Sequence, residues 1–485
     1  MHARLAVPAL ALCACAVAHP PPPRDAQKPA RPSIAFAMPD VPPAPPPPIA
    51  LATDEDHALR LAALEARTRV NGPLASTELH LRFVSDVARV TEGRFRITLP
   101  PRSFANRLAM KIEDKWREAD VVETAVARAT FEETMHVRRD PLLVEQRDDN
   151  ELTARVFPIP AFGEKEIIVG WVSEIGASSP ITIPLRGLDT LGDLDIRVTS
   201  GATELYARSA MHFVPPEDVR VAAPEGAAAL RSGENVALRV RVPGSAAPEP
   251  IGRGILVLVD TSASTATELD ATLALVRDVA SRLASDEPSA RFVVATFDQD
   301  VRVVHEGGAE LDPAIARIQA NGALGASDLG AALAWAAKRT DVDRVLLVGD
   351  GLATAGTSSR SKLRDAAASI AARIDAIAVG DVRDEPLLRD LAHGGAVSSA
   401  SLGADAIAAR LHRRAVAKTA VWVAGAKWSW PTTIENALEG DERFVYAELP
   451  EGVPLRANVG GRAIAPAIAS SNLSERAVAK AKIDA

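Results

Sequence analysis

A continuous apolar run that ends in an acidic residue constrains the fold of this chain more than any other feature. Residues 255–259 read Ile-Leu-Val-Leu-Val, and Asp260 follows at once. Strands that are buried on both faces read as unbroken apolar runs, and they occur in the centre of parallel sheets. Because neighbouring parallel strands need long crossover connections, we expect helices between this strand and the next ones.

Apolar runs and helical patterns do alternate downstream. Further strand-like runs lie at 292–297, 345–348 and 374–379. Stretches typical of helices lie at 268–283, 328–339, 361–372 and 385–391. This alternation predicts a doubly wound (Rossmann-like) α/β sheet over residues 251–415. Sheets of this kind bind ligands at the carboxyl ends of their strands, so a functional site is expected in the loops that follow them.

Oxygen-bearing side chains gather in three of those loops. They are Asp260, Ser262 and Ser264 after the first strand, Ser327 before the helix at 328–339, and Asp350 after the run at 345–348. Carboxylates and hydroxyls are hard ligands, and so small a set suits Mg²⁺, which keeps several of its waters. Neutral hydroxyls leave most of the cation's charge uncompensated. A carboxylate from another molecule can therefore complete the shell.

The arrangement resembles the metal-ion-dependent adhesion site (MIDAS) of von Willebrand factor A domains, whose motif is D-x-S-x-S, then a Thr, then an Asp. Four positions match residue by residue, namely Asp260, Ser262, Ser264 and Asp350. Ser327 stands where the family has Thr; it keeps the hydroxyl and lacks the methyl, and we expect coordination to survive. The resemblance implies Mg²⁺ as cofactor, with Mn²⁺ or Ca²⁺ as alternatives, and a protein ligand that supplies a carboxylate.

Two other interpretations remain open. In the first, Ser262 and Ser264 only cap the following helix, and the protein is a metal-free structural scaffold of the envelope. In the second, Asp260 is the nucleophile of a haloacid-dehalogenase-like phosphatase, but Ser262 stands where those enzymes have an acid/base Asp. The sequence contains no Walker A, G-x-S-x-G or H-E-x-x-H motif. We therefore expect a protein that is not an enzyme.

Residues 58–180 predict a β-rich domain with one helix. Alternating apolar residues at 78–83 and 93–100 indicate half-buried strands, and 119–134 has apolar residues near helical spacing. Three blocks, at 122–132, 139–145 and 155–160, occur in the order found in VIT domains, which are named for vault proteins and the inter-alpha-trypsin inhibitor heavy chains. The segment resembles that family, which often precedes a von Willebrand A domain. The resemblance implies a structural or docking module without catalytic chemistry.

The N-terminus is typical of an exported bacterial protein. Residues 5–18 are almost wholly apolar, which suits a signal peptide and is too short to span a bilayer comfortably. Either 16–18 is an A-x-A cleavage site, or 12–15 is a lipobox with Cys15 as the lipidated residue. We expect a location in the periplasm, at the outer membrane or on the cell surface. The mature chain is expected to have no transmembrane helix and to contact a membrane only through a lipid at Cys15.

Three further segments complete the predicted organisation after the signal at 1–18. Proline runs predict an extended tether over 19–57. Short β patterns at 181–250 predict a β-sandwich linker. Residues 416–485 predict a β-rich segment with a terminal helix.

Composition excludes several classes of partner. Lys and Arg number 55 against 63 Asp and Glu, which gives a net charge of −8. Nucleic acids and anionic membranes both need a basic binding surface, so we expect no nucleic-acid partner. The two cysteines, Cys13 and Cys15, both lie in the apolar N-terminal segment. The rest of the chain therefore has no disulfide and no cysteine-zinc site.

Overall fold

A computed structural model of the 485-residue chain describes residues 46–118, 121–123, 144–146, 150–176, 179–244 and 248–485. The expected export signal at 1–18 and both cysteines lie outside these residues, as does most of the stretch 119–134. Within the described ranges, no helix combines the length and the apolar character needed to cross a bilayer.

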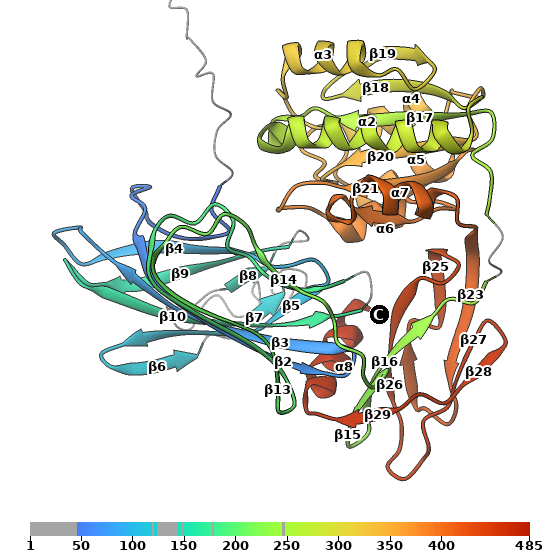
Figure 1. Ribbon diagram of the computed structural model, residues 1–485. Coiled ribbons are helices and arrows are strands. Elements are labelled where there is room, and N and C mark those ends of the chain that lie inside the picture. The colour runs from blue at the N-terminus through green and yellow to red at the C-terminus, as the bar shows by residue number, and fades with distance from the viewer. Residues whose placement is uncertain (1–45, 119–120, 124–143, 147–149, 177–178, 245–247) are drawn as a thin grey trace, which may run out of the picture. The chain divides into compact units, whose positions relative to one another are not determined.

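Two β-sheets share one apolar core in the N-terminal region (Figure 1). The first has the order β1-β4-β9-β8-β7 and consists of β1 (Ile49–Thr53), β4 (Thr91–Thr98), β7 (Val121–Glu123), β8 (Val144–Gln146) and β9 (Glu151–Ile159). The second has the order β13-β12-β2-β3-β10-β5-β6 and consists of β2 (Arg60–Asn71), β3 (Leu74–Val84), β5 (Ser103–Ile112), β6 (Lys115–Glu118), β10 (Glu164–Glu174), β12 (Leu191–Ser200) and β13 (Thr203–Phe213). A separate pair is formed by β11 (Ile181–Ile183) and β14 (Val219–Val221).

The alternation predicted at 78–83 is present in β3. Leu79, Leu81 and Phe83 are all buried, because alternate side chains of a strand point to the same face. The ring of Phe83 packs edge-on against Phe95 of β4, with 6.3 Å between the ring centroids. This contact joins the two sheets across the core.

Two expectations for this region differ from the structure. The tether was expected to reach residue 57, but Ile49 and Leu51 are buried in β1, which pairs with β4. Burying these apolar side chains outweighs the effect of the prolines that precede them. The helix expected over 119–134 is replaced at 121–123 by β7, which pairs in parallel with β8; the rest of that stretch lies outside the described residues.

The segment expected to be a β-sandwich linker at 181–250 does not form a unit of its own. Its strand β12 pairs in parallel with β2 of the N-terminal sandwich. Its strands β15 (Ala229–Ser232) and β16 (Asn235–Arg241) join a C-terminal sheet instead, where β16 pairs with β26 (Glu442–Glu448). The short-range pattern predicts strands correctly here, but partners far away in the sequence decide which sheet each strand joins.

The C-terminal β-rich segment is present as two small sheets. One has the order β24-β26-β16-β15-β29, with β24 (Trp428–Trp430) and β29 (Ile468–Ser470); the other has the order β25-β23-β27-β28, with β23 (Ala415–Val423), β25 (Thr433–Leu438), β27 (Ala457–Val459) and β28 (Arg462–Ile464). The terminal helix α8 (Leu473–Asp484) buries Leu473, Ala477 and Val478 against the first of these sheets.

The α/β domain is one six-stranded sheet with the order β19-β18-β17-β20-β21-β22. Its strands are β17 (Gly254–Asp260), β18 (Arg291–Phe297), β19 (Val301–Gly307), β20 (Arg344–Gly349), β21 (Arg373–Ala378) and β22 (Val397–Ser399). Its helices are η1 (Ala263–Glu268), α2 (Leu269–Asp286), α3 (Asp312–Asn321), α4 (Leu329–Ala336), α5 (Arg360–Ala368), α6 (Glu385–Leu391), η2 (Ala400–Leu402) and α7 (Ala404–Leu411). The strands pair in parallel except β19, an antiparallel edge strand that the sequence patterns did not indicate.

Helices cover both faces of this sheet (Figure 1). Ile255, Val257 and Val259 of β17 belong to the core under α2, α3 and α7, whereas Leu256 and Leu258 belong to the core under α4, α5 and α6. Every residue of β17 is buried. The unbroken apolar run in the sequence therefore reflects a central strand with helices on both sides, as predicted.

Candidate functional site

Asp260 lies at the point where the order of the strands reverses. It is the last residue of β17, and β18 lies on one side of β17 while β20 lies on the other. The connection from β17 leads to β18 on one side, and the later connection into β20 leads to the other side. A crevice forms at the carboxyl end of a sheet where the connections diverge in this way. The loops after β17 and β20 and the loop before α4 meet at this edge.

The carboxylate of Asp260 is held by two donors from different loops. Its Oδ1 accepts a hydrogen bond of 2.8 Å from the backbone N–H of Ser262, two residues later. Its Oδ2 accepts a hydrogen bond of 3.0 Å from the hydroxyl of Ser327. The side chain is 3% exposed. The first and second predicted site loops therefore meet at this carboxylate.

Asp350 enters the site from the neighbouring strand, flanked by two glycines. Its Oδ1 accepts a 2.9 Å hydrogen bond from the N–H of Leu352. A Cβ on Gly349 would lie 3.0 Å from the Cβ of Asp260, so the glycine leaves room for that side chain. Gly351 has φ +79° and a Cβ there would lie 2.8 Å from the carbonyl oxygen of Asp384. Only glycine fits this conformation without strain.

The two motif serines of the first loop lie at the start of η1. Ser262 is buried and Ser264 is exposed, and their hydroxyl oxygens are 3.1 Å apart. Ser262 occupies the N-cap position of η1, yet its side chain makes no capping hydrogen bond. The hydroxyl of Thr265 instead donates to the carbonyl of Ser262 at 2.9 Å. The interpretation of the serines as helix caps is therefore not supported by the local hydrogen bonds.

Ser327 is fixed by the loop that follows Asp350. Its N–H donates to the hydroxyl of Thr354 at 2.9 Å, and its carbonyl accepts from the N–H groups of Thr354 and Ala355 at 3.1 and 3.0 Å. Neither Thr354 nor Thr265 was singled out from the sequence. Their positions in the sequence match no motif that would mark them. Only the hydrogen bonds of the folded loops show that they support the site.

Burial and mutual repulsion dominate the electrostatics of the two carboxylates. Burial and, to a smaller extent, the nearby charge of Asp260 raise the pKa of Asp350 to about 6, against hydrogen bonds that lower it. Burial also raises the pKa of Asp260 above its ordinary value, despite hydrogen bonds from Ser262 and Ser327. In the described part of the chain, neither carboxylate forms an ion pair with Lys, Arg or His. The site therefore concentrates negative charge without a cationic partner.

The donor set fits a hard divalent cation. All five predicted residues meet at one edge of the sheet, and all of their side-chain donors are oxygens. Among the described residues, no three His, Cys, Asp or Glu side chains form a metal-binding group, so a cation here depends on the serine hydroxyls as well as on the two carboxylates. Small oxygen sets of this kind suit Mg²⁺ and Mn²⁺, which retain waters.

Comparison with known families identifies two regions of the chain. Residues 61–169 match the Vault protein inter-alpha-trypsin domain, and residues 253–396 match the von Willebrand factor type A domain. No curated protein sequence matches the chain significantly.

Several solved structures are similar to part of the chain. Proximal thread matrix protein 1 from the mussel byssus, with a zinc-occupied MIDAS motif, is 18% identical over 37% of this chain and 52% of that chain, with a TM-score of 0.29. The manganese-loaded TRAP protein of Plasmodium vivax is 15% identical over 43% of this chain and 82% of that chain, also at 0.29. An aerotolerance-related membrane protein from Bacteroides fragilis is 14% identical over 33% of this chain and 98% of that chain, at 0.28.

At TM-scores this low, these structural likenesses carry no conclusion about ligands or partners. The two family matches, in contrast, fall on the N-terminal β-sandwich and on the six-stranded α/β sheet, in the order that the sequence motifs indicate. The chain therefore contains a VIT domain followed by a von Willebrand factor type A domain.

Proposed function

We propose that this protein is a non-enzymatic, Mg²⁺-dependent protein-binding protein of the cell envelope. The single observation that carries the proposal is the buried pair Asp260 and Asp350, which has no cationic partner in the described residues and is surrounded by three hydroxyls. Two buried carboxylates that repel each other are costly unless a cation neutralises them. A divalent cation at this position removes that cost.

The five residues have different roles in this proposal. The hydroxyls of Ser262, Ser264 and Ser327 are the direct ligands that the resemblance implies, and the two carboxylates act largely through waters and hydrogen bonds. Asp260 also orients the hydroxyl of Ser327, which donates to it. A bound divalent cation supplies a positive charge that the neutral hydroxyls do not cancel.

The proposed ligand is an acidic side chain of another protein. Ser264 is exposed whereas the other four residues are buried, so the site is open to solvent on the side of η1. A carboxylate that approaches there meets neutral hydroxyls before it meets Asp260 or Asp350. Mg²⁺ is the proposed cation, and Mn²⁺ and Ca²⁺ are the alternatives. The proposed location in the envelope rests on the export signal read from residues 1–18.

Thermal unfolding of the full chain tests the metal site. The chain is melted with Mg²⁺, with Mn²⁺ and with EDTA, as wild type and as Ser264→Ala, which removes one exposed hydroxyl. A cation that binds only the folded state at about 100 times its Kd stabilises that state by about 2.7 kcal/mol. We expect a cation-dependent rise in Tm for the wild type and a smaller rise for Ser264→Ala.

Ser361→Ala is the matched control. Ser361 is also exposed, and its hydroxyl lies 3.0 Å from that of Ser359 at the start of α5, much as Ser264 lies beside Ser262. This variant should keep the full response to the cation. Identical melting curves with cation and with EDTA in the wild type would contradict the proposal and leave the metal-free scaffold.

A further inference from the structure

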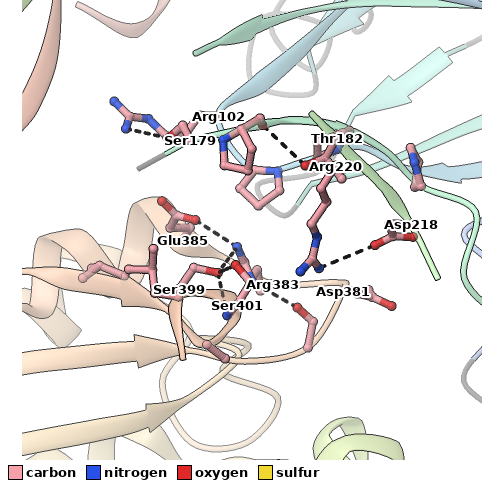
Figure 2. Close-up of a pocket in the computed structure, with 18 of the residues that line it drawn as sticks. Arg102, Ser179, Thr182, Asp218, Arg220, Asp381, Arg383, Glu385, Ser399 and Ser401 are labelled. Carbon is pink, nitrogen blue, oxygen red and sulfur yellow. Dashed lines mark hydrogen bonds and ion pairs between the residues drawn. The ribbon is translucent and has the colours of Figure 1, made fainter. Parts of the chain in front are cut away.

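A cavity of about 760 Å³, with charged side chains on both sides, lies between the VIT domain and the A domain (Figure 2). Arg102, Ser179, Thr182 and Arg220 line it from the VIT side, and Arg383, Glu385, Ser399 and Ser401 line it from the A-domain side. Among the described residues, no apolar cluster joins the core of the VIT region to the two cores of the A domain. Polar interfaces between domains permit relative motion unless specific contacts oppose it, so the direct contacts beside the cavity acquire particular weight.

Asn150 of the VIT domain makes one such contact. Its Nδ2 donates to the carbonyl of Asp381 at 2.8 Å, and its Oδ1 accepts from the N–H of Arg383 at 2.9 Å. The same amide therefore holds both a donor and an acceptor of the loop that follows β21. Asn150 is itself anchored to its own domain, because its Nδ2 also donates to the carbonyl of Leu99 at 2.6 Å and its carbonyl accepts from the N–H of Leu99 at 2.8 Å.

The loop that Asn150 holds lies directly against Asp350. The residue after Arg383 is Asp384, whose N–H donates to the carbonyl of Asp350 at 2.8 Å. The carbonyl of Asp384 is also the atom that excludes a Cβ at Gly351. A shift of this loop therefore moves the backbone on which the Asp350 carboxylate is mounted.

Arg186, in the loop after β11, contacts the segment after β17 that carries Ser262 and Ser264. Its Nη2 lies 2.5 Å from a carboxylate oxygen of Glu268 and 2.6 Å from one of Asp381. Glu268 is the last residue of η1, the short helix that contains Ser264 and begins just after Ser262. Arg186 thus links η1 to the loop held by Asn150. Asn150 and Arg186 therefore contact both segments that carry the site.

We propose that Asn150 and Arg186 are positioning residues for the cation site, so that docking of the VIT domain sets the affinity of the A domain for its cation. The inference rests on the proposed function and goes beyond it, because it assigns a role to residues that bind neither cation nor ligand. A partner that displaces the VIT domain from these contacts lowers the affinity for the cation. A partner that holds the domains together raises it.

Mn²⁺ binding to the full chain, followed by the loss of the electron paramagnetic resonance signal of free Mn²⁺, tests the inference. Asn150→Ala and Arg186→Gln should each raise the Kd for Mn²⁺ about tenfold, the lower end of the effects seen for side chains that support metal ligands. Arg186→Lys should stay close to wild type, because a single nitrogen, Nη2, makes both contacts of Arg186. The matched control is Arg82→Gln, since Arg82 pairs with Glu164 and Asp193 inside the VIT domain.

Hydrogen exchange at the Arg383 amide provides a second readout that does not depend on catalysis or on a known partner. Asn150→Ala should speed this exchange, because the variant removes the acceptor of that N–H. Coupling between two sites is reciprocal. Mn²⁺ should therefore slow exchange at Arg383 in the wild type, and should slow it less in Asn150→Ala.

The outcomes separate this inference from the proposed function. If wild type shows no Mn²⁺ binding that Ser264→Ala weakens, the proposed function itself is wrong. If wild type binds Mn²⁺ while Asn150→Ala and Arg186→Gln bind it with unchanged Kd, only the positioning role is overturned. If Asn150→Ala does not fold, the comparison of Arg186→Gln with Arg186→Lys and Arg82→Gln decides the question alone.

Discussion

The hydroxyl of Ser327 donates a 3.0 Å hydrogen bond to Oδ2 of Asp260, although the two residues are 67 positions apart in the chain. Helices η1, α2 and α3 and strands β18 and β19 lie between them in the sequence. Their contact shows that the loop after β17 and the loop before α4 pack against each other at the carboxyl edge of the sheet. The closed loops enclose the charge of the two buried carboxylates, Asp260 and Asp350.

Ser327 supplies a hydroxyl at a position where the family motif has Thr. Ser327→Ala should abolish most of the cation-dependent rise in Tm, because it removes a proposed ligand and a donor to Asp260. Ser327→Thr keeps the hydroxyl and should retain the response. Melting curves of both variants with Mg²⁺ and with EDTA make the comparison. Equal loss in the two variants would show that packing of the buried side chain, not its hydroxyl, matters.

Asp350 should make the stability of the cation-free protein depend on pH. Its pKa is about 6 when folded, against an ordinary value of 3.8. The folded state therefore holds a proton that the unfolded state has lost between these values, so this carboxyl's contribution to stability is full below pH 3.8 and is lost as the pH rises through 6. The difference between the two pKa values corresponds to a change in the free energy of unfolding on the order of 3 kcal/mol.

Asp350→Asn isolates that contribution from the other titrating groups. In EDTA, the stability of Asp350→Asn relative to wild type should increase as the pH is raised from 4 to 7. With saturating Mg²⁺ at pH 7 the order should reverse, because the charged carboxylate then faces a cation. Urea unfolding at a series of pH values measures both trends. A difference that does not change with pH would contradict the raised pKa of Asp350.

Substitutions at Gly351 and Gly403 distinguish the cost of backbone strain from the cost of a steric clash. Both have φ +79°, but a Cβ at Gly351 would lie 2.8 Å from the carbonyl oxygen of Asp384, whereas a Cβ at Gly403 would meet nothing within 4 Å. Each Gly→Ala change should lower the free energy of unfolding by about 1 kcal/mol or more through φ alone. Gly351→Ala should lower it further and weaken Mn²⁺ binding, because the loop beside Asp350 must move.

The control in this experiment is built into the pair. Gly403→Ala should leave the Kd for Mn²⁺ unchanged, since η2 and α7 carry none of the proposed ligands. Equal effects of the two substitutions on Mn²⁺ binding would show that the loop at 380–384 does not position Asp350.

Docking of an acidic ligand should depend on the cation. A library of peptides presented to the immobilised full chain in Mg²⁺ should be enriched in sequences with an exposed Asp or Glu, and EDTA should release them. Changing that residue to Asn or Gln in an enriched peptide should abolish binding, because the amide carries no charge for the cation. Enriched peptides that bind equally in EDTA and Mg²⁺ would place the binding surface elsewhere on the protein.

Local patterns in the sequence were sufficient to predict the α/β domain, and they singled out five oxygen-bearing residues that the structure brings to one edge of its sheet. The unbroken apolar run before Asp260 indicates a strand covered on both faces, and parallel strands bring their carboxyl ends to one edge of the sheet. Residues in the loops after such strands must therefore lie near one another. Asp260 and Asp350 were predicted to lie together for this reason. Ser327, in the loop that opens α4, was predicted with them, and the structure brings all three together.

Other features depended on contacts between residues far apart in the chain. The antiparallel edge strand β19 and the division of 181–250 between two sheets follow from strand pairing, which is decided by packing partners that a local pattern does not contain. The same holds for β1, whose residues Ile49 and Leu51 follow a proline run and are nevertheless buried in the VIT sandwich.

The sequence by itself determined the type of domain, the order of its loops and the chemistry of the oxygens at their ends, because these depend on residue type and periodicity. Only the tertiary structure decided what surrounds those oxygens. The raised pKa of Asp350 arises from burial and from the charge of Asp260. The contacts of Asn150 and Arg186 with the site loops arise from the docking of one domain on another. Burial and docking are properties of the folded chain as a whole, and no segment of the sequence specifies them alone.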